Sequence, residues 1–554
     1  MISFTLHPAT SVAAIAAGLA LVSVPAYADM ETLLEKLHAK GILSEDEFNE
    51  MRQDVREARR EAAMDKVNKT NAAQKQMVGE GFKFTSGDKQ TEFALTGRVN
   101  VDYRFIDHNL PEAVNATLFA TSDRDTASLA DGFELRRARL GVKGFVYKDF
   151  KYEFQANAVG GAPTADVYFV NYARYNTAQL TLGRFKQPFS LEELTSSNDI
   201  DFAERSYVNQ NGQFSKKIGA MLSGEPIKGL VYGASVYQQG FNEVSESDGK
   251  GLLSAGRVAA NFGQLFNVRD TVIHFGVAGV SGTYQDRPSQ SGQTNRSFEA
   301  TTRSTVASFR TLNRGFNNIY RTQVGGSLLG GGPLGLTSSG VGRSGLVSEY
   351  ASEIESSLWG TEAALAYGPV KLQGEYSSNK INAIDLTTAA ATASRVSGDV
   401  KTFYAQLMWN ITGEKWADMY SGGVFKGVKP TNNFKPGSGW GAWQVGIRYS
   451  EFDASDLRVR VRGDGARVQC GNAQEINTVN ATCSTNTTGS WGLGVNWIMN
   501  PNSRFMFEWT RTDFGNTRII PLDSVGRNDA GGLTSASQGT KAENVFSFRT
   551  QFNF

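Results

Sequence analysis

Side-chain polarity alternates with a period of two from about residue 90 to the end of the 554-residue sequence. In the last such segment, Phe546, Phe548, Phe552 and Phe554 alternate with Ser547, Arg549, Gln551 and Asn553. Because successive side chains of a β-strand point to opposite faces, the pattern predicts an all-β fold with one apolar and one polar face. In a soluble sandwich the polar face would meet bulk water, whereas in a transmembrane β-barrel it would line a wet lumen and the apolar face would meet lipid.

The connections between the predicted strands distinguish these two folds. We expect about sixteen strands, starting near residues 91, 134, 149, 165, 179, 216, 230, 254, 271, 357, 370, 399, 440, 488, 503 and 543. Short links (147–149, 175–177, 368–369 and 500–502) alternate with long ones (107–131, 187–215, 282–350, 455–487 and 514–541). Alternating short turns and long loops on an even number of strands are typical of an antiparallel transmembrane barrel, with periplasmic turns and external loops. The long link at 412–439 breaks the rule, since a short turn is expected there.

Residues 1–28 have the layout of a secretory signal peptide. The apolar stretch from Val12 to Val22 is followed by Ala26-Tyr27-Ala28, which is an A-x-A cleavage signal. No Lys or Arg precedes that stretch, so an apolar helix that stays in the mature protein is the alternative. After residue 28 no apolar run approaches the roughly 18 residues that a membrane helix needs. We therefore expect an exported protein in the outer membrane of a Gram-negative cell, with its barrel in contact with lipid.

Residues 29–80 are predicted to be helical. Gly41 suits the end of a first helix, and Ser44 to Glu47 form a capping box at the start of a second. Phe48, Met51 and Val55 then lie on one narrow apolar stripe. Because that stripe is too narrow to be buried within one chain, we expect a short periplasmic coiled coil made by copies of the chain. A helix that lies on the barrel is the alternative. The helical segment could also tether the protein to peptidoglycan. We expect residues 81–554 to form the barrel domain.

Basic side chains are predicted to line the lumen. The totals of 56 Lys and Arg and 55 Asp and Glu argue against a strongly basic nucleic-acid-binding protein, so the position of each charge matters more than the sum. Arg137, Arg139 and Lys143 share the strand face opposite Leu140 and Val142. Guanidinium groups match the oxygen pairs of phosphate and carboxylate, which favours an anion-binding lumen. Arg136 has the wrong parity unless a bulge turns it, and a wall whose charges are balanced by opposite Asp and Glu is the alternative.

Seven segments carry a family resemblance: ELRRARLGVKGFVYKDFKYEF (134–154), LGRFKQPFSLEELTSS (182–197), FAERS (202–206), GPVKLQGEYS (368–377), NITGEKW (410–416), GAWQVGIRYSEFD (441–453) and GVNWIMNP (494–501). With these segments the chain resembles the phosphate-selective porin O and P family over residues 80–554. The resemblance implies a homotrimer of sixteen-stranded barrels whose infolded loops narrow each pore, and an arginine ladder that draws anions towards a central site. It also implies that Arg136 and Arg137 form the central basic pair, with Arg184 as a third basic residue and Lys186 as its neighbour.

Two departures from the family weaken a phosphate assignment. The resemblance implies that phosphate-specific members carry an Asp among the central basic residues. In our alignment this chain has Asn157 at that position. The long loop 282–350 carries Arg303, Arg310, Arg314 and Arg321 too sparsely for one continuous ladder on an extended strand. We therefore expect a porin for small anions in general, with phosphate, polyphosphate and organic carboxylates left open.

The remaining expectations concern other functions. Aromatic residues near strand ends, such as Trp409 and Trp497, suit membrane interfaces, although a sugar-type porin would also use aromatic faces. His274 has lumenal parity but no Ser-His-acid set accompanies it, so we expect no enzyme, no cofactor and no metal site. Cys470 and Cys483 both fall in the external loop 455–487, where we expect a disulfide.

Overall fold

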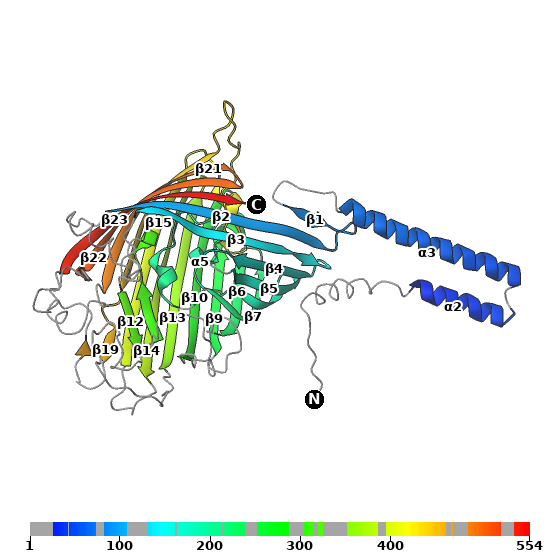
Figure 1. The fold of residues 1–554 in the computed structure, drawn as a ribbon, viewed down its shortest axis with the longest axis horizontal. Helices are drawn as coiled ribbons and strands as arrows, with labels where there is room; N and C mark the ends of the chain where they lie inside the picture. Colours follow the sequence, from blue (N-terminus) through cyan, green and yellow to red (C-terminus); the bar gives the residue numbers. More distant parts are fainter. Residues whose placement is uncertain are drawn as a thin grey trace, which may run out of the picture. The chain divides into compact units, whose positions relative to one another are not determined.

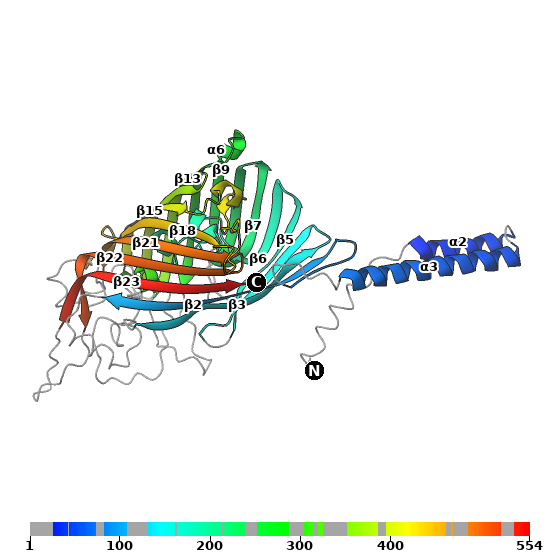
Figure 2. The same ribbon diagram turned by 90° about the horizontal axis from the view of Figure 1, so that it is seen from above.

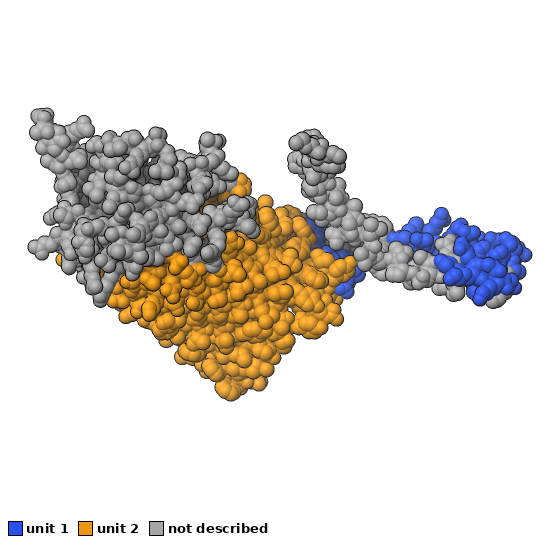
Figure 3. Space-filling model, turned by 90° about the horizontal axis from the view of Figure 1, so that it is seen from below, with its two compact units in different colours: residues 1–78, 83–92 blue, residues 79–82, 93–554 orange. Residues whose placement is uncertain are grey.

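The computed structural model describes residues 26–41, 44–73, 82–107, 131–160, 163–212, 214–238, 252–286, 304–314, 320–324, 352–385, 395–460, 467–468, 486–521 and 537–554. It divides into two compact units, residues 1–78 with 83–92 and residues 79–82 with 93–554 (Figure 3). Residues 1–25 of the predicted signal peptide (1–28) and the predicted disulfide between Cys470 and Cys483 lie outside the described residues, whereas residues 26–28 begin the first described helix.

The first unit contains two helices, α2 (Ala26–Ala39) and α3 (Glu45–Ala73), and the short strand β1 (Lys83–Thr85). Gly41 follows α2 with a φ of 71°, a left-handed conformation that glycine adopts without strain. The capping box is confirmed, because the Ser44 backbone N–H donates to Glu47 Oε2 at 2.9 Å and the Glu47 N–H donates to Ser44 Oγ at 3.4 Å. His38 and Phe48 stack with ring centroids 4.5 Å apart and join the two helices. No helix in the described part of the chain is long and apolar enough to cross a membrane. A coiled coil between copies of the chain stays a prediction.

The second unit is a closed antiparallel β-barrel of sixteen of the described strands, as predicted (Figures 1 and 2). The barrel strands are β2 (Glu92–Asp107), β3 (Gly132–Val146), β4 (Phe150–Asn157), β5 (Thr164–Tyr175), β6 (Ala178–Lys186), β7 (Lys216–Ile227), β8 (Leu230–Gln238), β9 (Leu252–Asn261), β10 (Thr271–Asp286), β13 (Ser352–Tyr367), β14 (Val370–Asp385), β15 (Arg395–Asn410), β18 (Ala442–Asp453), β21 (Thr487–Asn500), β22 (Ser503–Pro521) and β23 (Ser537–Asn553). Each pairs with the next in this order, and β2 pairs with β23, which closes the sheet and leaves no free edge. The last strand begins at Ser537, earlier than the predicted start near residue 543.

The outer face of the barrel is apolar, as the period of two predicts. On β23, Phe546, Phe548 and Phe552 are 39%, 42% and 50% exposed, whereas Ser547 and Arg549 between them are buried. The same contrast holds on other strands, for example between the exposed Leu372 and the buried Gln373 on β14. The exposed face therefore suits lipid, and the polar face points into the barrel.

The barrel interior is filled by connections between strands. The link from β6 to β7 contains α5 (Leu191–Leu194) and the 3-10 helix η1 (Tyr207–Gln210). The described part of the link from β10 to β13 contains β11 (Ser304–Phe309), the 3-10 turn η3 (Leu312–Arg314) and β12 (Tyr320–Val324). The link from β15 to β18 contains η4 (Trp416–Met419), β16 (Tyr420–Ser421) and β17 (Val424–Phe425). Smaller elements outside the lumen are α6 (Phe262–Leu265), β19 (Arg458–Arg460) and β20 (Arg467–Val468).

Two apolar clusters of buried residues form where these links meet the inner wall. One includes Phe189, Tyr207, Phe309 and Phe452, and so joins the β6–β7 link, the β10–β13 link and strand β18. The other includes Leu191, Phe202, Trp416 and Phe425, and joins the β6–β7 link to the β15–β18 link. The core of this barrel is therefore inside the lumen, between infolded links and one part of the wall.

Candidate functional site

The β6–β7 link, residues 187–215, lies inside the barrel and is fixed to the wall formed by β14 to β23. Lys371 Nζ on β14 donates to Asp201 Oδ2 at 2.7 Å, and Arg448 Nη1 on β18 donates to the Glu204 carbonyl at 2.8 Å. The hydroxyl groups of Tyr207 and Ser490 are hydrogen-bonded at 2.9 Å. These contacts join the link to β14, β18 and β21, so the link is a fixed part of the lumen.

Two basic side chains, Lys186 at the end of β6 and Arg205 of the link itself, support the start of the link. Lys186 Nζ and Arg205 Nη2 each donate to the Thr195 carbonyl at 2.9 Å, just past the end of α5. Arg205 Nε also lies 3.2 Å from Glu193 Oε2. Carbonyl groups left without partners at the end of a helical turn are stabilised by cations, so these two side chains hold α5 in place.

Arg136 lies in the lumen because strand β3 changes phase. Leu135 and Leu140 are both exposed on the outer face, at 46% and 55%, although they are an odd number of residues apart. Strict alternation would place them on opposite faces, so one extra residue is accommodated between them, as in a β-bulge. Arg136 and Arg139 consequently both reach into the lumen. The change of phase that a lumenal Arg136 requires is therefore present on β3.

Arg136 forms a bidentate ion pair with Glu204 of the β6–β7 link. Arg136 Nε donates to Glu204 Oε1 at 2.6 Å and Nη2 donates to Oε2 at 3.0 Å. Arg549 Nη2 on β23 donates to the same carboxylate at 3.1 Å. Burial raises the pKa of Glu204, but the nearby guanidinium groups of Arg136, Arg137 and Arg549 lower it further, and the net pKa lies well below its usual range. Glu204 is thus an ionised carboxylate.

Arg139 pairs with Asp166 of β5. Arg139 Nη1 lies 2.9 Å from Asp166 Oδ2, and Lys216 of β7 binds the same carboxylate. An aspartate, Asp166, therefore stands among these basic residues, and the alignment of Asn157 with the Asp of phosphate-specific members stays a prediction. Asn157 is the cross-strand partner of Arg139 on β4, and its Oδ1 has no hydrogen-bond partner among the described residues.

Two further guanidinium groups in this region have no carboxylate partner in the described part of the chain. Arg98 on β2 is 8% exposed, and its Nη1 donates to Ser197 Oγ at 2.5 Å. Arg137 on β3 is 5% exposed, and its Nη1 is buried without a hydrogen-bond partner among the described residues. A buried cation without a counter-ion is costly, and a transient anion would remove that cost. We call Arg98, Arg136, Arg137, Arg139, Lys186, Arg205 and Lys216 the cationic cluster.

The structure brings four of the six predicted pore-lining residues into the cationic cluster: Arg136, Arg137, Arg139 and Lys186. Lys143 is exposed and lies near the β3–β4 turn, with Glu153 as its cross-strand partner. Arg184 Nε donates to the Asp166 carbonyl at 3.2 Å, and its basic neighbour is Lys217. Sequence reasoning missed Lys216, Arg205 and the carboxylates of Asp166 and Glu204; the charged FAERS segment at 202–206 contains two of them and was a usable signal.

The long loop between β10 and β13 contributes one described cation. The Arg310 backbone N–H donates to Gln210 Oε1 at 2.8 Å, and Arg310 Nη2 lies 3.8 Å from Glu204 Oε2. This loop therefore reaches the β6–β7 link in the lumen. Arg303 lies outside the described residues, as do the side chains of Arg314 and Arg321.

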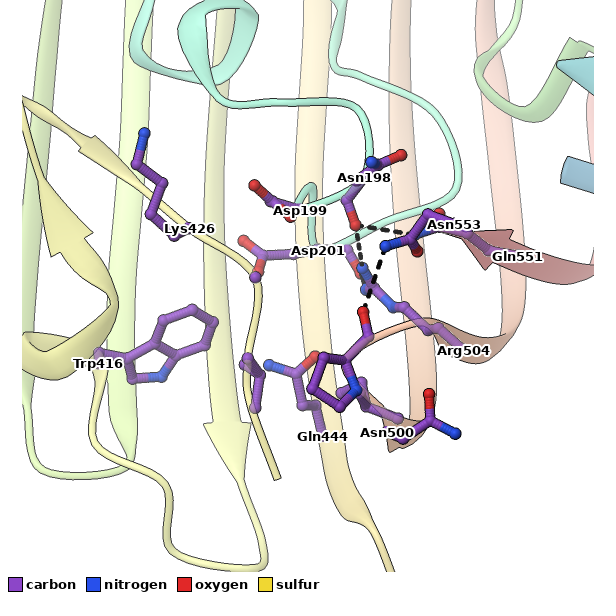
Figure 4. Close-up of a pocket in the computed structure, with 14 residues that line it drawn as sticks. Asn198, Asp199, Asp201, Trp416, Lys426, Gln444, Asn500, Arg504, Gln551 and Asn553 are labelled. Carbon is purple, nitrogen blue, oxygen red and sulfur yellow. Dashed lines mark hydrogen bonds between the residues drawn. The ribbon is translucent and has the colours of Figure 1, made fainter. Parts of the chain in front are cut away.

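The unexpected long link at 412–439 also folds into the lumen. Trp416 is 1% exposed, its backbone N–H donates to the Gly368 carbonyl at 3.0 Å, and its ring centroid lies 3.8 Å from Lys371 Nζ. A cavity of about 40 Å³ separates this link from the β6–β7 link, and Asp199, Lys426 and Arg504 are among the residues that line it (Figure 4). An infolded link needs enough residues to reach the lumen, which explains why a short turn does not occur here.

His274 is part of this infolded structure. Its Nδ1 is hydrogen-bonded to the Tyr420 hydroxyl at 2.6 Å, and its Nε2 to Glu362 Oε1 at 2.9 Å. Both ring nitrogens are therefore engaged. In the described part of the chain, no group of three or more His, Cys, Asp and Glu side chains could hold a metal ion.

Comparison with known proteins gives one family. Residues 116–311 and 347–514, more than half of the chain, match the family model described as phosphate-selective porin O and P. Porin O of Pseudomonas aeruginosa is 27% identical over 432 residues, which cover 76% of this chain and 82% of that protein.

Solved structures that resemble this one include other outer-membrane proteins. An anion-selective porin from Comamonas acidovorans has a TM-score of 0.42 at 11% identity, over 84% of this chain and 100% of that chain. OmpT of Vibrio cholerae has a TM-score of 0.42 at 10% identity, over 84% and 98% of the two chains. The channel DcaP of Acinetobacter baumannii has a TM-score of 0.41 at 9% identity, over 86% and 100%.

Proposed function

This chain belongs to the phosphate-selective porin O and P family, and from that premise we propose that its cationic cluster binds phosphate-like oxyanions in transit. The protein is an outer-membrane porin for small anions. Family membership alone does not show which side chains of this chain select the anion.

The observation that carries the proposal is the pair of buried guanidinium groups of Arg98 and Arg137. Every other arginine of the cluster has a carboxylate within ion-pair distance: Arg136 has Glu204, Arg139 has Asp166 and Arg205 has Glu193. Arg98 and Arg137 have no ion pair in the described part of the chain, so their charge remains available to a solute. An oxyanion can accept bidentate hydrogen bonds from guanidinium groups, and these are stronger where little water competes.

The paired carboxylates support moderate rather than extreme affinity. Glu204 and Asp166 offset part of the positive charge next to the two free guanidinium groups. A pore must release its solute as well as bind it, so binding has to stay weak enough for the anion to leave. We therefore expect phosphate, polyphosphate and organic carboxylates all to enter, with preference set by how many oxygens reach Arg98 and Arg137.

Arg137→Gln tests the proposal. Hydrogen bonds to charged groups contribute roughly 1.5–3 kcal/mol, so phosphate should block the chloride current about tenfold more weakly in the variant. The permeability ratio of chloride to potassium should also fall. The measurement is current through single pores in a planar bilayer, with phosphate titrated against KCl.

Arg174→Gln is the matched control, since Arg174 is exposed and pairs with Asp149 at 3.5 Å, away from the cationic cluster. Equal phosphate block in the two variants would contradict the role of Arg137. Folding should survive Arg137→Gln, because a buried cation without a partner costs stability instead of adding it.

The remaining expectations are also our proposals. Residues 1–28 are removed on export, α2 and α3 lie in the periplasm, and three copies of the chain assemble, as the resemblance implies. Tethering to peptidoglycan by those helices would be a separate role. Since both ring nitrogens of His274 are engaged with Tyr420 and Glu362, we infer that this histidine is structural and that the channel carries no enzymatic activity.

A further inference from the structure

A second cavity leads from the cationic cluster to the edge of the barrel that carries the short turns. Its volume is about 260 Å³. Lys186 of the cluster and Leu194 of the β6–β7 link line one part of it, and Asn176 of the β5–β6 turn lines another. Gly233 of β8 and Gly422, between β16 and β17, also line it. The cavity therefore lies between the wall of β6 to β8 and the β16–β17 hairpin.

In the described part of the chain, the other side of the lumen at this level holds packed apolar side chains and the smaller cavity of about 40 Å³. Trp416, Phe425 and Val428 of the β15–β18 link are buried in one apolar cluster with Ala364 and Met408, which belong to β13 and β15. Closely packed apolar side chains leave no room for a hydrated ion. An anion that leaves the cationic cluster towards the short turns consequently meets the larger of the two cavities on the β6–β8 side.

The β16–β17 hairpin is held in a fixed position by buried wall residues. Arg257 Nη2 on β9 donates to the Gly423 carbonyl at 2.8 Å, and Arg257 Nε donates to Glu362 Oε1 at 2.8 Å. Glu362 Oε1 is in turn hydrogen-bonded to His274, which holds the Tyr420 hydroxyl. The hairpin is therefore anchored at β16 through Tyr420 and at its turn through Gly423, and Gly422 of the same turn lines the cavity.

We propose that this cavity is the exit passage of the pore and that the β16–β17 hairpin is a second selectivity element, whose turn at Gly422 forms the inner wall of the passage. The proposal rests on the proposed function, because it concerns the path that an anion takes after the cationic cluster. The charged side chains that line the cavity are Lys186, Arg257 and Glu225. A charge added at Gly422 would act on a small anion across less than the roughly 8 Å Debye length of physiological salt, and would be screened little.

Gly422 offers a test in which size is held constant. Its φ is 60°, and an ideal Cβ there would meet no atom within 4 Å. Asn and Asp are the non-glycine residues that adopt this left-handed conformation most readily. Gly422→Asp and Gly422→Asn therefore differ in charge and hardly in shape or backbone strain.

We expect Gly422→Asp to lower the permeability ratio of chloride to potassium by about two-fold or more relative to Gly422→Asn, in planar bilayers with a KCl gradient. The control pair is Gly437→Asp and Gly437→Asn, at a residue of the same link whose φ is 81° and whose ideal Cβ is also free. Gly437 does not line the cavity, so that pair should give equal ratios.

Equal ratios for the two Gly422 variants would overturn the proposal. If neither Gly422 variant forms pores, Glu225→Gln takes their place: removal of this cavity carboxylate should raise the same ratio, and an unchanged ratio would overturn the proposal. A wild-type pore without anion selectivity would instead refute the proposed function, so the two failures are distinguishable.

Discussion

Single residues in this lumen divide into cations that are used by the fold and cations that are left for a solute. Lys371, Arg448 and Arg549 bind the β6–β7 link through carboxylates and carbonyl groups, and are therefore structural. Arg98 and Arg137 lack carboxylate partners in the described part of the chain. Charge alone does not separate these two classes, because both consist of buried basic side chains on inward-facing strand positions. Their partners do.

Glu204 is the residue that sets how much free positive charge the cationic cluster has. In Glu204→Gln, Arg136 loses its ion pair and Arg549 keeps only Asp102, so a phosphate should bind more tightly and the chloride current should be blocked at lower concentration. Breaking a buried ion pair should also destabilise the barrel, by about 3–5 kcal/mol. Phosphate titration in bilayers and urea unfolding measure the two effects.

Glu508→Gln is the control for that change. Glu508 is equally buried and pairs with Arg448 at 3.5 Å, outside the cationic cluster. It should lose stability without a gain in phosphate block. Weaker block in Glu204→Gln than in the wild type would contradict the assignment of Glu204.

For single residues, the sequence predicts that basic side chains line the lumen, but it does not predict reliably which side chains point inward. Arg136 reaches the lumen only because β3 holds one extra residue between Leu135 and Leu140, and a strict period of two places it outside. Asp166 joins Arg139 and Lys216 from strands that are 27 or more residues away along the chain, so no local pattern reveals it. Side-chain partners across a barrel depend on register, which single-sequence periodicity does not fix.

Secondary-structure elements are where the alternation of polarity is most informative. Lipid on one side and water or infolded links on the other impose the same period on all sixteen strands, so strand positions follow from the pattern. The link at 412–439 is the exception that the pattern singles out, and it is the one that enters the lumen from the short-turn edge. The sequence shows that this link is too long, but its apolar residues are too few and too scattered to reveal where they pack.

Trp416 should carry much of the stability of that infolded link. It is 1% exposed, and its Nε1 donates to the Pro369 carbonyl at 3.0 Å. Trp416→Ala should cost about 3–5 kcal/mol in urea unfolding, since truncating a large buried side chain leaves a cavity. The link would then be held less firmly, and single-channel conductance should rise with added current noise.

Trp409→Ala provides the comparison, because Trp409 is 49% exposed on the outer face. It loses the same side chain without opening the lumen, so its conductance should equal that of the wild type. An unchanged conductance in Trp416→Ala would show that the infolded link does not limit the current.

The whole molecule combines a closed barrel with a lumen that is filled on one side. The β6–β7 and β15–β18 links pack against β10 to β23, and the cationic cluster and the larger cavity lie along β2 to β9. An anion path confined to one side of the lumen brings each ion close to Arg98 and Arg137, which a wide central channel would not. Anion selectivity therefore depends on which part of the inner wall the infolded links leave uncovered, as much as on the number of arginines.

The most direct test of that account is the zero-current potential of the purified wild-type protein in a planar bilayer under a KCl gradient, followed by titration of phosphate against the chloride current. We predict a reversal potential on the anion side and block of chloride at low phosphate concentration. A cation-selective or non-selective pore would contradict the central claim, because two buried guanidinium groups without carboxylate partners would then have no effect on the ions that pass them.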